Sequence, residues 1–219
     1  MAVSLPLYER FRPLSWAGVI GQDRALRALD CVRRLHGTLA GQVYWLAGPS
    51  GTGKTTIARL IAAEVGQDWT IEEIDAADLD VDTTRRWVRQ CQSRPLGGGH
   101  WVFIINEAHT LRGPIVSKLQ TALEDPLVQR NSTWCFTTTD EGESLLFDKT
   151  DGVPFLSRAK ALPMARQGLA KPFAAWLRAK AAELGLNGKP ESAYVRLLQD
   201  CKNNLRAALQ QVECGAMLG

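Results

Sequence analysis

Segments typical of buried strands alternate with segments whose apolar residues recur every three or four positions, over the first two thirds of the chain. The segments that we predict to be strands are 43–47, 70–74, 101–105 and 133–138. The segments with helical spacing are 55–65, 81–93 and 114–123. Continuous apolarity, clearest at 101–105, is typical of strands buried on both faces, and parallel strands need helical crossovers. The pattern therefore predicts an α/β fold with a parallel sheet covered by helices on both faces.

The pattern changes after about residue 163. Three helical segments, 172–184, 190–200 and 203–214, follow one another with no strand between them. We therefore predict two domains, an α/β domain over 1–163 and a small all-helical domain over 164–219. A polar loop of unusual length is expected at 140–152, and loops of that length are usually functional or mobile.

Composition adds mild constraints. The chain has 219 residues, of which 45% are hydrophobic and 22% charged, as in an ordinary soluble globular protein. The net charge of +3 permits contact with nucleic acid without requiring it. The five cysteines lack CxxC spacing, so neither a zinc site nor a disulfide framework is indicated, and a reduced, cytoplasmic setting is expected. Without a signal peptide or a long apolar stretch, no membrane partner is expected.

A glycine-rich loop between the first strand and the following helix carries the clearest chemistry. Its sequence, GPSGTGKT, fits the pattern G-x-x-x-x-G-K-[ST], in which backbone N–H groups and a helix N-terminus surround phosphates. The lysine would bridge the β- and γ-phosphates, and the threonine hydroxyl would ligate Mg²⁺. We therefore expect ATP and Mg²⁺ as cofactors. The residues expected at the phosphates are Gly48, Pro49, Ser50, Gly51, Thr52, Gly53, Lys54, Thr55 and Thr56.

The third strand ends in an amide followed by an acid. In an ATPase a strand such as WVFIINE is expected to end in two acids, and here Asn106 takes the place of the first. Asn106 keeps a carbonyl oxygen, so with Thr55 it remains an expected metal ligand, but it loses a negative charge and charge-assisted hydrogen bonds are stronger. Glu107 is expected to orient the attacking water. We therefore expect ATP binding to persist, Mg²⁺ to be held more weakly and hydrolysis to be slow.

A series of further motifs runs in order from about residue 8 to residue 209. They are ERFRPLSWAGVIGQDRAL, VDTTRRWVRQCQSRP, FIINEAHTLRGPIVSKLQTALEDP, WCFTTTD, LSRA and NNLRAAL. Together with the glycine-rich loop they resemble the clamp-loader group of AAA+ ATPases. That group includes the bacterial DNA polymerase III tau/gamma subunit and the small subunits of replication factor C.

The resemblance implies roles for residues outside the phosphate loop. Near the N-terminus, the residues implied to pack against adenine are Arg12, Pro13, Val19 and Gly21. Thr138 would contact the γ-phosphate or the attacking water, although Thr137 and Thr139 leave the position open and a strand-end threonine is the alternative. Arg158 would be an arginine finger reaching the ATP of an adjacent subunit, unless it is a solvated surface charge. Arg206 would report the γ-phosphate to the helical lid, with an interdomain salt bridge as the alternative.

The resemblance also implies partners: sister AAA+ subunits, a sliding clamp and primed double-stranded DNA. The residues predicted to contact DNA are Arg85, Arg86, Arg89, Arg112 and Lys118, and the alternative there is a solvated helix face. The main functional hypothesis is an ATP-driven clamp-loader subunit in DNA replication. The competing hypothesis is a regulatory or structural subunit that binds nucleotide with weak or no hydrolysis. A branch-migration motor is a third, which the LSRA motif disfavours.

Departures from the group bear on these hypotheses. Asn106 replaces an aspartate, Ala159 replaces the cysteine of the SRC motif, and the 140–152 loop is longer. The tau/gamma zinc module is missing. The collar domain that holds the group's pentamers together would follow the lid, and we expect this chain to lack it, whether it is a minimal protein or a piece of a longer one.

Overall fold

The computed structural model describes residues 5–139 and 157–219 of the chain. These residues form two compact units. The first combines Met1–Asp23, Pro49–Gly53 and Ala165–Gly219, and the second combines Arg24–Gly48 and Lys54–Met164. The predicted boundary between residues 163 and 164 stays a prediction, and the loop predicted at 140–152 lies outside the described residues.

The second unit contains a five-stranded parallel sheet. This sheet confirms the predicted fold class. The strands are β1 (Val43–Ala47), β2 (Ile71–Asp75), β3 (Trp101–Asn106), β4 (Ser132–Thr138) and β5 (Lys160–Pro163), and their order is β2-β3-β4-β1-β5. The sequence pattern did not predict β5, because a four-residue strand that contains Lys160 and Pro163 has no apolar run. Its backbone pairs with β1, placing Ala47 opposite Pro163.

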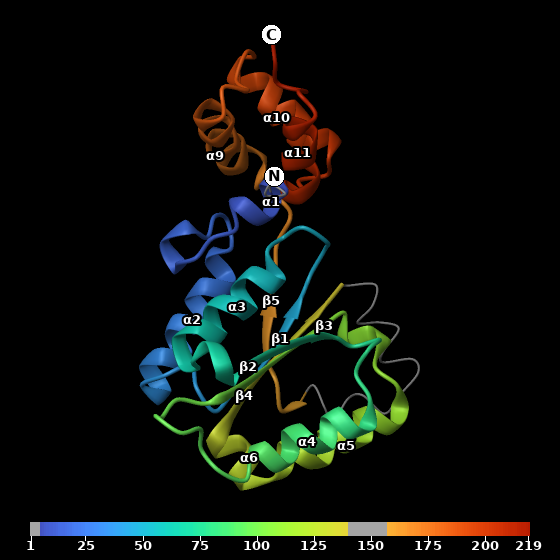
Figure 1. Cartoon of the computed structure of the whole chain (residues 1–219). Helices are drawn as coiled ribbons and strands as arrows, with labels where there is room; N and C mark the ends of the chain where they lie inside the picture. Colours follow the sequence, from blue (N-terminus) through green and yellow to red (C-terminus); the bar gives the residue numbers. More distant parts are fainter. Residues whose placement is uncertain (1–4, 140–156) are drawn as a thin grey trace. The chain divides into compact units, whose positions relative to one another are not determined.

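Helices cover both faces of this sheet (Figure 1). On one face lie α2 (Asp23–His36) and α3 (Lys54–Val65); on the other lie α4 (Val81–Gln90), α5 (Gly113–Glu124) and α6 (Pro126–Asn131). The predicted helix over 81–93 ends at Gln90, and Asp80 is its N-cap, accepting a hydrogen bond from the Thr83 N–H. Short 3-10 turns are formed by Asp68–Thr70 and Ala108–Thr110.

Aromatic side chains fill the core between the sheet and the α4–α5 layer. Trp87 of α4 stacks on Phe103 of β3 with ring centroids 4.6 Å apart, and Phe103 lies 4.4 Å from the Trp134 ring of β4. All three side chains are buried, so the core fixes α4 against the middle strands of the sheet. The burial of these rings stabilises the packing of α4 on β3 and β4.

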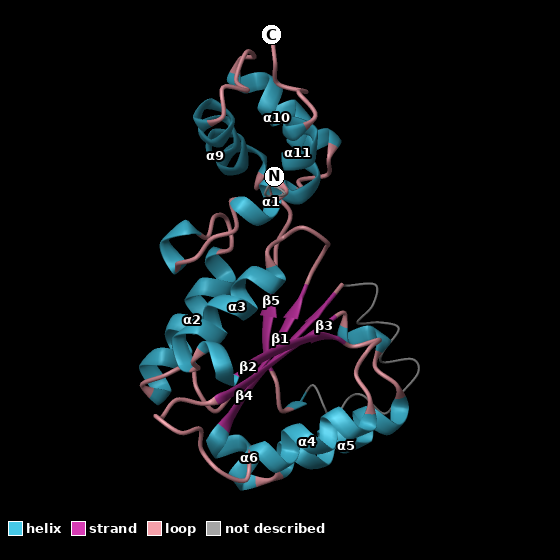
Figure 2. Cartoon of the chain, in the orientation of Figure 1, coloured by secondary structure: helices cyan, strands magenta, loops and turns pink. Residues whose placement is uncertain are grey.

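The first unit is helical apart from its loops (Figure 2). It contains α1 (Leu7–Arg10), a 3-10 turn at Trp16–Gly18, α9 (Ala170–Glu183), α10 (Glu191–Asp200) and α11 (Leu205–Glu213). Its core is built from Phe173, Leu177, Tyr194, Leu198 and Leu209. The three helices predicted after residue 163 are therefore confirmed, with ends shifted by up to two residues. Among the described residues, no helix is both long and apolar enough to cross a membrane.

Candidate active site

Gly48 and Lys54, on either side of the tip of the phosphate loop, belong to the second unit, and Lys54 is buried. Lys54, the first residue of α3, is 7% exposed and donates a hydrogen bond from Nζ to the Gly48 carbonyl at 2.8 Å. Gly48 has φ 152°, and a Cβ there would lie 2.5 Å from the Met164 carbonyl oxygen. Only glycine fits this position, so the turn after β1 keeps the amine of Lys54 at the loop.

The tip of the loop, residues 49–53, belongs to the first unit. Thr52 closes the tip by donating from Oγ1 to the Pro49 carbonyl at 2.8 Å. Gln22 is buried, donates from Nε2 to the Thr52 and Ala165 carbonyls and accepts from the Ala165 N–H. Arg166 donates to the Ser50 carbonyl at 2.6 Å. Gln22 belongs to the N-terminal motif that the resemblance places against adenine, next to the predicted Gly21, whereas no motif marked Arg166.

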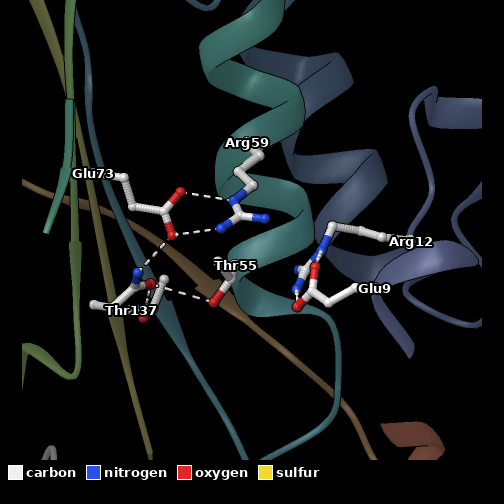
Figure 3. A network of polar contacts seen from close by, with 7 residues as sticks. Glu9, Arg12, Thr55, Arg59, Glu73 and Thr137 are labelled. Atoms are coloured by element: carbon white, nitrogen blue, oxygen red, sulfur yellow. Dashed lines mark hydrogen bonds and ion pairs between the residues drawn. The ribbon is translucent and has the colours of Figure 1, made fainter. Parts of the chain in front are cut away.

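The end of β3 lies within hydrogen-bond distance of the helix that follows the phosphate loop (Figure 3). Asn106 Oδ1 accepts hydrogen bonds from Thr55 Oγ1 at 3.2 Å and from Thr137 Oγ1 at 3.1 Å. Asn106 Nδ2 donates to Glu73 Oε1 at 2.8 Å. Glu73 in turn receives two hydrogen bonds from Arg59, at 2.7 and 3.0 Å. The structure thus brings the predicted pair Thr55 and Asn106 together with Thr137, and adds Glu73 and Arg59, which the sequence did not single out.

Thr137, rather than Thr138, faces Asn106. Successive side chains of a strand point to opposite faces, so only one of the two can share the face of Asn106. Thr138 is fully buried, and its hydroxyl lies 3.3 Å from His109 Nδ1 and donates to the Thr139 carbonyl. A contact between Thr138 and the γ-phosphate therefore stays a prediction, while Thr137 has the position beside the expected metal ligands.

Glu107 has a backbone that non-glycine residues rarely adopt, with φ 50° and ψ 48°. Its side chain is half exposed, and Oε2 lies 3.5 Å from His109 Nδ1. Both Glu107 Oε2 and the Thr138 hydroxyl therefore lie near the same nitrogen of His109. His109 was not predicted as a site residue, although it lies in the motif tail AHTL.

The remaining predicted residues each have partners within their own unit. Arg158 forms an ion pair with Glu124 at the end of α5. In the first unit, Arg12 donates from Nε to Glu9 at 3.0 Å, and the Arg206 guanidinium lies 5.4 Å from the centre of the Tyr8 ring.

The other residues predicted for adenine also lie in the first unit. Val19 ends the 3-10 turn at Trp16–Gly18, and Pro13 packs against Gly18. Gly21 has φ 70°, and a Cβ there would lie 2.5 Å from a Leu169 methyl carbon. These positions fix a tight N-terminal turn, and their contact with adenine stays a prediction.

Two of the five residues predicted to contact DNA are engaged in ion pairs. Arg86 makes two hydrogen bonds to Glu72, at 2.6 and 2.7 Å, and Arg85 pairs with Asp82 at 2.9 Å. Burial raises the pKa of the Glu72 carboxyl, but hydrogen bonds from Arg86 and Trp87 outweigh it and leave that pKa below its usual range. Among residues 5–139 and 157–219, Arg89, Arg112 and Lys118 form no ion pair.

The donor set at Asn106 fits Mg²⁺ only if a ligand completes it. Thr55 Oγ1 and Asn106 Oδ1 are hard oxygen donors 3.2 Å apart, and Mg²⁺ prefers a few protein oxygens supplemented by substrate phosphates and water. In the described part of the chain, no group of three or more His, Cys, Asp or Glu residues could hold a metal by itself. The phosphate loop beside Thr55 is the motif that supplies phosphates to such a site.

Comparisons with known proteins agree with this geometry. Residues 44–149 match the sequence model of the ATPase family associated with various cellular activities (AAA). The chain is 31% identical over 146 residues to the DNA polymerase III subunit tau of Salmonella typhimurium, covering 55% of this chain and 22% of that protein. It is 33% identical over 106 residues to the replication-associated recombination protein A of Escherichia coli, covering 48% of this chain and 23% of that protein.

The fold also resembles that of a solved structure. The Holliday junction branch migration motor RuvB of Thermotoga maritima superposes with a TM-score of 0.71 over 93% of this chain and 64% of that chain, at 23% identity. At this identity the likeness concerns the fold alone. The chain spans less than a quarter of the length of the two curated relatives described above. Residues 44–149 are thus similar to the AAA family of ATPases, and parts of the chain are similar to proteins of DNA replication and recombination.

Proposed function

We propose that this chain is an ATP-hydrolysing AAA+ subunit of the clamp-loader type. The observation that carries the proposal is the contact of Thr55, in the first turn of α3 after the phosphate loop, with Asn106 at the end of β3. This contact joins the two motifs that an ATPase needs, on a parallel sheet whose carboxyl ends gather catalytic side chains. The match of residues 44–149 to the AAA family and the similarity of the chain to DNA polymerase III subunit tau support the same function.

Each residue of the site has a defined task in this proposal. Lys54 exchanges its hydrogen bond to the Gly48 carbonyl for one to a phosphate oxygen of ATP. Thr55 and Asn106 hold Mg²⁺, which when bound neutralises charge that develops on the phosphates. Glu107 orients the attacking water, and His109 Nδ1 lies 3.5 Å from its carboxylate. Because Asn106 is neutral, we expect Mg²⁺ to be held weakly and turnover to be slow.

The partners follow from the clamp-loader type. We propose that the subunit acts with sister AAA+ subunits, with a sliding clamp and with primed double-stranded DNA, and that Arg158 completes a neighbouring subunit's site. Arg12, Pro13, Val19 and Gly21 would surround adenine, and Arg206 would respond to the γ-phosphate. The similarity to DNA polymerase III subunit tau supports this set of partners.

The proposal is tested by ATP binding and phosphate release with Lys54→Met. Methionine keeps the buried stem of Lys54, so thermal melting should be little changed while ATP affinity, measured by calorimetry, falls at least about 100-fold, as for a lost charge-assisted contact. The matched control is Lys189→Met, since Lys189 Nζ also donates to a backbone carbonyl, that of Ala216 at 2.9 Å. Equal ATP affinity in wild type and Lys54→Met would refute the proposal.

A regulatory subunit that binds ATP without useful turnover is the second candidate. An acid is expected at position 106, and the neutral amide of Asn106 found there favours this second candidate. The same experiment separates the two: wild type that binds ATP tightly but releases no phosphate above the Glu107→Gln background, even with DNA present, is a nucleotide-binding switch.

A further inference from the structure

Glu73 is connected to the expected metal site although it does not face phosphates. We propose that Glu73 is a positioning residue, which fixes the side-chain amide of Asn106 so that its oxygen, and not its NH₂ group, faces Thr55. This inference rests on the proposed function, because the oxygen of Asn106 matters only if the site holds Mg²⁺ with ATP.

The hydrogen bonds of Asn106 permit one orientation of its amide. Oδ1 accepts from Thr55 and Thr137, and Nδ2 donates to the Glu73 carboxylate at 2.8 Å. An ionised carboxylate accepts hydrogen bonds and cannot donate them. A flipped amide would place its oxygen against the Glu73 oxygen, with both groups acceptors and no proton between them. Glu73 therefore selects the orientation.

Glu73 is itself held in place by an arginine. Arg59 Nε donates to Glu73 Oε2 at 2.7 Å, and its NH2 group donates to Oε1 at 3.0 Å. Such two-pronged contacts are among the stronger and more directional hydrogen bonds in proteins. The register of the sheet places Glu73 beside Ile104 and Asp75 beside Asn106, so Glu73 shares a sheet face with Asn106. The chain Arg59–Glu73–Asn106 is thus a continuous support reaching from α3 across two strands.

The support is specific to an asparagine. An aspartate presents an oxygen to the metal whichever way its carboxylate turns, because both ends are equivalent. Asparagine presents an oxygen in one orientation only, and in the other its NH₂ group would meet the cation with like partial charge. Glu73 should therefore control metal retention when residue 106 is asparagine and lose that control when it is aspartate.

The experiment measures the Mg²⁺ concentration that half-saturates binding of a fluorescent ATP analogue. With Glu73→Leu, this concentration should rise about 10-fold, the size expected for a lost charged hydrogen bond. Glu73→Gln keeps an acceptor for Asn106 Nδ2, so its half-saturating Mg²⁺ concentration should stay close to that of wild type. Binding of the analogue in excess EDTA should be the same in all variants, because Lys54 and the loop are untouched.

The decisive comparison repeats Glu73→Leu in an Asn106→Asp background, where we expect no rise in the Mg²⁺ requirement. The matched control is Glu72→Leu. Glu72 lies on the same strand as Glu73 and has an equivalent two-pronged pair with Arg86, so its loss should leave the Mg²⁺ requirement unchanged. An equal rise in both backgrounds, or no rise with Asn106, overturns the positioning role. Wild type that fails to bind the analogue at all would instead refute the proposed function.

Discussion

Glu107 combines the proposed catalytic role with a strained backbone. Its φ of 50° and ψ of 48° lie in the left-handed region, which costs most L-amino acids roughly 1–2 kcal/mol and is easiest for glycine and asparagine. The tight turn between β3 and the 3-10 turn at Ala108–Thr110 imposes this conformation. Backbone strain of this kind is common at functional sites, so the conformation of Glu107 agrees with its proposed catalytic role.

The first prediction separates the backbone strain at position 107 from the catalytic role of the Glu107 side chain. Glu107→Asn should raise the melting midpoint by about 1–3 °C, because asparagine tolerates the left-handed region and ~1 kcal/mol shifts a domain of this size by a few degrees. Phosphate release should fall in the same variant. Glu107→Gln is the control, since it removes the acid and keeps the strain. A midpoint that rises equally in Glu107→Gln would show that charge, and not strain, limits stability.

His100 makes stability depend on pH. Burial lowers the pKa of its imidazole below the ordinary value of 6.5, and the hydrogen bond with the Ser132 backbone offsets this only in part. Nδ1 is buried and has no hydrogen-bond partner in the described part of the chain. Below pH 6.5 the unfolded chain therefore binds a proton that the folded chain resists.

The second prediction follows from that sign. The stability contributed by neutral His100 is fully present above pH 6.5 and falls as the pH decreases below 6.5 toward the folded pKa. The slope is at most about 1.4 kcal/mol per pH unit for one proton. Denaturant unfolding of His100→Asn between pH 7 and pH 5 should show a shallower loss than wild type. The exposed His36→Asn is the control, and an unchanged slope in His100→Asn would contradict the prediction.

At the scale of elements, the sequence predicted what depends on local pattern. The buried strands and the phosphate loop before α3 follow from residue type and spacing. β5 could not be predicted, because its pairing with β1 comes from tertiary contact and not from apolarity. Glu73 was missed for a related reason: its neighbour Asn106 lies 33 residues away, and only the register of β2 on β3 brings them together.

The same limit explains the threonine run. β4 ends in Thr137 and Thr138, and Thr139 follows it; the pattern does not say which threonine shares a face with Asn106, and the hydrogen bond from Thr137 assigns that place to Thr137. Pairing across elements, and not propensity, thus decided the details of the candidate site.

Helix α4 carries the third prediction. Arg85 and Arg86 are already paired with carboxylates, so contact with DNA phosphate would first have to break those pairs. If α4 lies on DNA, Arg89→Ala should lower the salt slope of binding to primed duplex by about 0.9, the value for one phosphate contact, and Arg86→Ala should lower it less. Glu72→Gln should tighten binding by freeing Arg86. Equal salt slopes in wild type and the triple variant of Arg85, Arg86 and Arg89 would mean that the helix face is only solvated.

At the scale of the whole molecule, the role proposed for Arg158 would make the site depend on a second subunit. Lys54, Thr55, Asn106 and Glu107 are supplied by the chain that binds ATP, whereas Arg158 forms an ion pair with Glu124 of its own chain. For Arg158 to stabilise a neighbour's phosphates, it must exchange Glu124 for that anion when subunits assemble. Hydrolysis should therefore depend on protein concentration, because a free subunit lacks the arginine at its nucleotide.

The last prediction uses two inactive variants. Lys54→Met should bind no ATP and yet offer Arg158, and Arg158→Ala should bind ATP and yet offer no arginine. Each alone should release phosphate at least ~100-fold more slowly than assembled wild type, since an arginine finger contributes 10³–10⁵ in turnover at full effect. Mixed in equal amounts, the two should recover part of the activity, because an Arg158→Ala subunit then meets a neighbour with an intact arginine. The control uses Arg178→Ala in place of Arg158→Ala. It also breaks an exposed ion pair, that of Arg178 with Glu191, but this variant should be active by itself. A mixture no more active than the sum of its components, at concentrations where sedimentation detects assemblies, would place Arg158 outside the neighbour's site.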